Sequence, residues 1–62
     1  MLSDATLLDF EARHPGHPGH KQQAIETELG ITAARYYQLA IRAAQSLEGM
    51  AHDPITARRL LQ

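Results

Sequence analysis

The sequence has 62 residues, enough for one small domain, and its seven acidic residues slightly outnumber its six basic ones, which gives a formal net charge of −1. It contains no cysteine, so disulfide bonds and thiolate metal sites are excluded. Its apolar runs are too short to span a membrane, and residues 1–4 lack the basic and apolar regions of a signal peptide. We therefore expect a single cytoplasmic domain, residues 1–62.

The first predicted helix covers about residues 4–13. Ser3 is a residue type that caps the N-terminus of helices, and Asp4 suits the positive end of the helix dipole. The side chains expected to be buried are Leu7, Leu8 and Phe10, and those expected in solvent are Asp9, Glu11 and Arg13.

A loop follows, in which the string His-Pro-Gly occurs twice, at 14–16 and 17–19, before His20. Its prolines and glycines prevent a regular helix. Three imidazoles at every third position could bind a transition metal, but neither a thiolate nor a nearby carboxylate completes such a site. We therefore predict a structural loop that holds no metal.

The most informative pattern in the sequence is a short helix, a glycine turn and a second helix. Ile25 and Leu29 are four residues apart and share one face of a helix over about 21–29. Gly30 can end that helix in the left-handed conformation, and Thr32 is a typical N-cap for the next one. This arrangement is typical of a helix-turn-helix, whose second helix lies in the major groove of DNA.

The helix that begins at Thr32 is expected to continue to about residue 48. Its faces follow from a rotation of about 100° per residue. One apolar stripe, expected in the core, consists of Tyr36, Leu39, Ala40, Ala43 and Leu47. The polar stripe consists of Arg35, Gln38, Arg42 and Gln45, and a second apolar strip between them consists of Ala33, Tyr37, Ile41 and Ala44.

Residues 49–52 are expected to break this helix. Asp53 followed by Pro54 is typical of an N-cap with proline in the first helical position. The pair predicts a last helix over about 54–61, with Ile55, Leu60 and Leu61 directed inward and Arg58 and Arg59 outward. No alternating β-branched run predicts a strand, so the expected fold class is all-α, a small three- to four-helix domain containing a helix-turn-helix.

Seven short segments together resemble a family of short, uncharacterised actinobacterial proteins. They include the strings Gly-Ile-Thr-Ala and Arg-Tyr-Tyr-Gln and occupy residues 8–11, 17–19, 23–25, 30–33, 35–38, 51–54 and 58–60. The glycine turn also resembles that of sigma-factor and repressor DNA-binding domains. The resemblance implies a helix-turn-helix-like fold and carries no established activity.

Our first hypothesis is a transcriptional regulator that binds double-stranded DNA with the helix 32–48 in the major groove, as a dimer or beside other transcription proteins. Arginine can bind guanine edges or phosphates, and glutamine can bind adenine edges. The residues expected near base edges are Ala33, Ala34, Tyr37 and Gln38, and those expected to hold phosphates are Lys21, Thr32, Arg35 and Arg42.

A net charge of −1 is low for an independent DNA-binding domain, because neutralisation of phosphates supplies most of the affinity. Our alternative hypothesis is therefore a protein-interaction module of similar fold that docks a partner such as the transcription machinery. The docking residues would be Ala33, Tyr37, Ile41 and Ala44.

Enzymatic motifs are not found in the sequence. It has no phosphate-binding glycine loop, no paired carboxylates in a recognisable motif and no cysteine nucleophile. Its two serines, Ser3 and Ser46, are explained by a helix cap and a helix surface. We therefore predict that the protein is not an enzyme and uses no cofactor or small-molecule substrate.

Overall fold

A computed structural model describes residues 2–62, which form five α-helices and one π-helical segment. The elements are α1 (Asp4–Arg13), α2 (Gly19–Ala24), the π-helix η1 (Ile25–Leu29), α3 (Ala33–Gln45), α4 (Leu47–His52) and α5 (Pro54–Leu60). No strand occurs in this part of the chain, so the all-α prediction is confirmed. None of these helices has the length and apolar character needed to cross a membrane.

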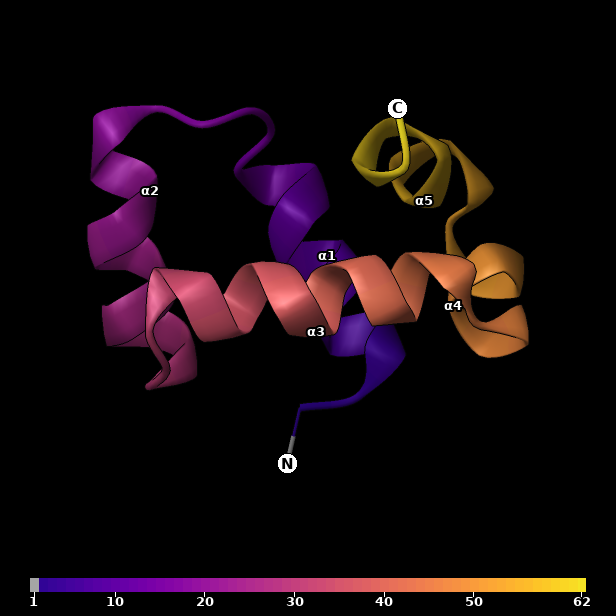
Figure 1. Ribbon diagram of the computed structural model, residues 1–62, viewed down its shortest axis with the longest axis horizontal. Helices are drawn as coiled ribbons and strands as arrows, with labels where there is room; N and C mark the ends of the chain where they lie inside the picture. The colour runs from indigo at the N-terminus through magenta and orange to yellow at the C-terminus, as the bar shows by residue number, and fades with distance from the viewer. Residues whose placement is uncertain (1) are drawn as a thin grey trace.

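The longest helix, α3, is the axis of the fold. It packs against α1 and α5, and Figure 1 shows it running across the front of the molecule, with α2 at its N-terminal end and α4 at its C-terminal end. Small side chains on its inner side let the neighbouring helices approach closely. The buried apolar residues are Leu7, Leu8, Phe10, Ile25, Tyr36, Ala40, Ala43, Ala44 and Ala57.

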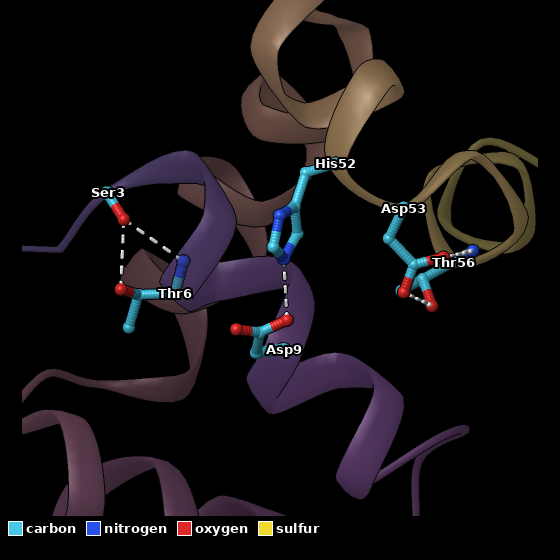
Figure 2. A network of polar contacts seen from close by, with 6 residues as sticks. All are labelled: Ser3, Thr6, Asp9, His52, Asp53 and Thr56. Atoms are coloured by element: carbon cyan, nitrogen blue, oxygen red, sulfur yellow. Dashed lines mark hydrogen bonds and ion pairs between the residues drawn. The ribbon is translucent and has the colours of Figure 1, made fainter.

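Side chains cap three of the helices where the sequence predicts it. The N-caps are Ser3 for α1, Thr32 for α3 and Asp53 for α5. Their side-chain oxygens accept hydrogen bonds at 3.0–3.1 Å from the backbone N–H groups of Thr6, Arg35 and Thr56, and Figure 2 shows the first and last of these caps. Each cap satisfies a donor that has no partner inside its own helix, which fixes where the helix begins.

The turn before α3 also has its predicted conformation. Gly30 has φ +70° and ψ +23°, in the left-handed region, and ends η1. The preceding helical segment differs from the expected continuous α-helix over 21–29, because it begins at Gly19 and becomes π-helical at Ile25. A π-helical turn shifts the side chains that follow it relative to an unbroken α-helix.

The C-terminal half contains an error of prediction, because the expected helix 32–48 ends at Gln45. Ser46 has an extended backbone, and its hydroxyl accepts a hydrogen bond from the Gly49 N–H at 2.9 Å and lies 2.7 Å from Asp4 Oδ2. Residues 49–52, expected to break the helix, are therefore helical and belong to α4. Leu47, expected in the core, is 89% exposed.

Gly49 explains how α4 can fold back on the end of α3. A Cβ atom at this position would lie only 1.9 Å from the carbonyl oxygen of Ala43, so only glycine allows the observed approach. The last helix, α5, begins as predicted, but Ile55 is 65% and Leu61 45% exposed instead of buried. Thr56 and Ala57 face the core in their place, because the cap at residue 53 sets the rotation of this short helix.

Candidate functional site

One long face of α3 is uncovered. Ala34, Arg35, Gln38, Arg42 and Gln45 are all exposed, and no other helix passes in front of α3 in Figure 1. The core-facing side of the same helix is fully buried, which gives α3 two sharply different sides. The structure therefore brings the predicted polar stripe together on one regular helix of 13 residues.

Basic and acidic residues are segregated between the helices. Four of the six basic residues lie on α3 and α5, as Arg35, Arg42, Arg58 and Arg59, and neither helix contains an aspartate or glutamate. All four arginines are exposed. Although the net charge of the chain is −1, every charged side chain that α3 and α5 carry is therefore positive.

Several carboxylates are engaged away from this surface. Glu28 precedes α3 in the chain, but it pairs with Arg13 at 3.4 Å and His14 at 3.3 Å, at the end of α1. Asp9 accepts a hydrogen bond at 2.7 Å from His52, which raises the pKa of this histidine and ties α4 to α1 (Figure 2). These contacts hold two of the negative charges on the α1 side of the molecule.

Lys21 is not free to hold a phosphate, so its predicted role is wrong. Its side chain is 1% exposed, and Nζ donates to Glu11 Oε1 and to the carbonyl oxygen of Gly16, both at 2.7 Å. Glu11, expected in solvent, is buried for the same reason. The pair is ten residues apart, and no helical periodicity connects the two positions.

Tyr36 completes this buried cluster. Its hydroxyl donates to Glu11 Oε1 at 2.6 Å, and its ring lies edge-on to Phe10 with centroids 5.2 Å apart. Burial, together with the neighbouring Glu11 carboxylate, raises the pKa of Tyr36 far above its usual range. The tyrosine is in the core as predicted, and its hydroxyl is buried with it.

The second apolar strip of α3 is only partly accessible. Ala33, Tyr37 and Ile41 are half-buried, and Ala44 is fully buried, so Ala44 cannot serve as a docking residue. The Tyr37 hydroxyl lies 2.9 Å from His17 Nδ1, with the two ring centroids 5.3 Å apart. His17 thus covers part of this strip.

The histidines of the loop have separate partners. His14 approaches Glu28 and stacks on Phe10, with ring centroids 4.5 Å apart, whereas His17 contacts Tyr37. Within residues 2–62, no three histidine, aspartate or glutamate side chains gather where one metal ion could reach them. The two histidines therefore pack against different residues, Phe10 of α1 and Tyr37 of α3.

A family model described as a protein of unknown function, DUF3263, matches residues 2–62. The chain belongs to this family. The match covers every residue whose structure is described, and it agrees with the expectation of an uncharacterised family. No curated protein and no solved structure gives a significant match.

Proposed function

We propose that this protein is a transcriptional regulator that binds double-stranded DNA through the exposed face of α3. One observation carries the proposal: α3 and α5 hold four exposed arginines and no acidic residue, and α3 is uncovered along one side. DNA binding depends on cations placed against phosphates, so the local charge of the contact surface matters more than the total.

In this proposal η1, the turn 30–32 and α3 form the helix-turn-helix, and α3 enters the major groove. Ala34 and Gln38 approach base edges, with Tyr37 beside them, while Arg35 and Arg42 hold phosphates on either side. The Thr32 hydroxyl, which already caps α3, keeps a proton to donate to a phosphate oxygen. Lys21 takes no part, and Ala33 contributes only its half-buried methyl group.

The small number of cations limits how tightly one copy can bind. Each neutralised phosphate contributes about 0.9 to the slope of log affinity against log salt concentration, so four arginines give a slope of roughly −3.6 at most. Regulators that read DNA with single short domains commonly place two copies on neighbouring half-sites. We therefore propose that the protein binds as a homodimer or beside another transcription protein.

The test compares two arginine variants with the same change of charge. Arg35→Ala removes a cation from the exposed face of α3, and Arg13→Ala removes one from the end of α1, where it pairs with Glu28. Fluorescence anisotropy with labelled duplex DNA, titrated with salt, should show a slope smaller by about 0.9 for Arg35→Ala only. Equal losses in both variants would mean that DNA senses only net charge, and the proposed interface would be wrong.

Base reading is tested separately at Gln38. With a pool of random duplexes, Gln38→Ala should relax the base preference by about 1–3 kcal/mol at one position, with a smaller effect on total affinity. The side chains of Arg35 and Gln38 are both exposed, so neither Arg35→Ala nor Gln38→Ala should alter the circular dichroism spectrum. Wild-type affinity of the double variant Arg35→Ala/Gln38→Ala at moderate salt would overturn the proposal.

The alternative, a module that docks a protein such as the transcription machinery, rests on a smaller surface than the sequence suggests. Ala33, Tyr37 and Ile41 remain half-exposed for such a partner. Ile41→Asp distinguishes the two functions, because a charge in an apolar contact strongly weakens protein docking. If Ile41→Asp abolishes a biological activity that Arg35→Ala leaves intact, the docking function is the correct one.

A further inference from the structure

A cleft with a volume of about 450 Å³ lies between the end of α1, the first His-Pro-Gly loop, α3 and α5. Its lining includes Glu11, Tyr37, Ile41, Arg59 and Leu60. Small-molecule sites in proteins have volumes of roughly 300–1,000 Å³ and combine apolar walls with a few convergent polar groups. The cleft has both properties, and it shares Tyr37 and Arg59 with the proposed DNA-binding surface but adds Glu11 and Leu60, which that surface does not use.

The Glu11 carboxylate supplies a hydrogen-bond acceptor to the cleft. Its side chain is 9% exposed, and Oε1 is occupied by Lys21 Nζ and the Tyr36 hydroxyl. Within residues 2–62, no side chain or backbone group forms a hydrogen bond with Glu11 Oε2. Every fully buried side-chain oxygen or nitrogen in this part of the chain does have a hydrogen-bond partner. Oε2 is therefore not fully buried, and Glu11 is one of the residues that line the cleft.

Arg59 supplies a positive charge and hydrogen-bond donors to the cleft. It extends from α5, is exposed, and forms no ion pair with any carboxylate among the described residues. Lys21 already pairs with Glu11, so the Arg59 guanidinium is a further cation at the cleft. A ligand that fits needs an N–H donor for Oε2, an anionic group for the guanidinium, and a short apolar part.

We propose that this cleft binds a free α-amino acid with an apolar side chain. Its ammonium group donates to Glu11 Oε2, its carboxylate accepts from the Arg59 guanidinium, and its side chain packs against Ile41 and Leu60. A carboxylate has about four acceptor sites, so Glu11 can keep both of its present partners while it binds the ligand. Arginine is suited to the carboxylate because its planar donors match two oxygens at once.

The ligand chemistry is tested with a matched set of three probes. Leucine carries both charged groups, 3-methylbutylamine lacks the carboxylate, and 4-methylpentanoate lacks the amine. Backbone amide shifts in a ¹⁵N-labelled sample should saturate with leucine at residues that line the cleft, with each truncated probe binding about tenfold or more weakly, as expected for the loss of a charged hydrogen bond. If the amine or the acid binds as tightly as leucine, the zwitterion model is wrong.

Two neighbouring arginines provide the matched protein variants. Arg59→Gln removes the guanidinium from the cleft, whereas Arg58→Gln makes the same change of charge on the same helix at a residue that does not line it. Leucine affinity should fall about tenfold in Arg59→Gln only. Equal losses in both variants would overturn the site.

To identify which amino acid binds most tightly, the titration is repeated with each of the other apolar amino acids. If none of them, leucine included, gives saturable shifts in the cleft, the proposal is refuted. The measurement uses no DNA, so its failure would leave the proposed DNA-binding function standing.

Discussion

The hydroxyl of Tyr36 offers a direct test of the buried cluster, through the substitution Tyr36→Phe. This change keeps the ring in its place against Phe10 and removes only the group that donates to Glu11 Oε1 at 2.6 Å. Glu11 keeps its bond from Lys21 Nζ at 2.7 Å, so no charge is left without a partner. The expected loss is therefore that of one hydrogen bond to a charged acceptor.

Such a bond contributes about 1.5–3 kcal/mol to the free energy of unfolding. A domain of this size has a total stability of roughly 3–9 kcal/mol, so the loss is a large share of the whole. In small domains each kcal/mol lowers the melting temperature by about 4–8 °C, which predicts a decrease of roughly 6–24 °C. Urea unfolding, followed by circular dichroism at 222 nm, gives the free energy directly.

Tyr37→Phe is the matched control. Its hydroxyl also has a hydrogen-bond partner, His17, but Tyr37 is only half-buried and His17 is exposed. We expect a loss of about 0.5 kcal/mol in the free energy of unfolding, at the low end for a protein hydrogen bond. If the two variants lose equal stability, or if Tyr36→Phe melts like the unmodified protein, the buried cluster does not stabilise the fold as argued.

Three further predictions concern the turn, the α3–α4 junction and the pH dependence. Gly30→Ala should lower the free energy of unfolding by about 1 kcal/mol, because residue 30 has a positive φ. Gly49→Ala should lower it by about 3 kcal/mol or more, because the new Cβ atom would meet the carbonyl oxygen of Ala43. Urea titrations that reverse this order would contradict the observed packing. The pKa of Tyr36 is raised in the folded state, so this residue contributes stability below about pH 10 that is lost as the pH rises further. Absorbance at 295 nm should therefore show one phenol that ionises only as the chain unfolds. Tyr36→Phe should remove that step. Hydrogen bonds from Thr56 lower the pKa of Asp53, so this residue contributes stability above about pH 4 that is lost as the pH falls. Between pH 6 and pH 2, the melting temperature of Asp53→Ala should therefore decrease less than that of the unmodified protein.

The starts of α1, α3 and α5 could be predicted because a side-chain cap is a local interaction. Ser3, Thr32 and Asp53 each bond to an N–H group three residues ahead, and that spacing is visible in the sequence. Ser46 caps α4 with the same spacing, by accepting from the Gly49 N–H, but the apolar periodicity of residues 32–48 favours one continuous helix. The end of α3 depends on two further features: the Ser46 hydroxyl donates to Asp4, 42 residues away, and Gly49 has no Cβ atom to meet the Ala43 carbonyl oxygen. Contacts of that kind exist only after α1 has packed against α3 and α4.

The role predicted for Lys21 is wrong for a similar reason, because its contact with Glu11 forms only when the helices pack. This contact also changes how the net charge of the protein should be interpreted. The sequence counts this lysine among the cations open to phosphate, but its charge is cancelled inside the protein by Glu11 at 2.7 Å. Glu28 is likewise paired with Arg13 and His14, and Asp9 is hydrogen-bonded to His52, so two further carboxylates are engaged by side chains of the protein itself. A total of −1 is therefore compatible with a cationic contact surface, and the DNA-binding proposal depends on Arg35 and Arg42, not on the sum.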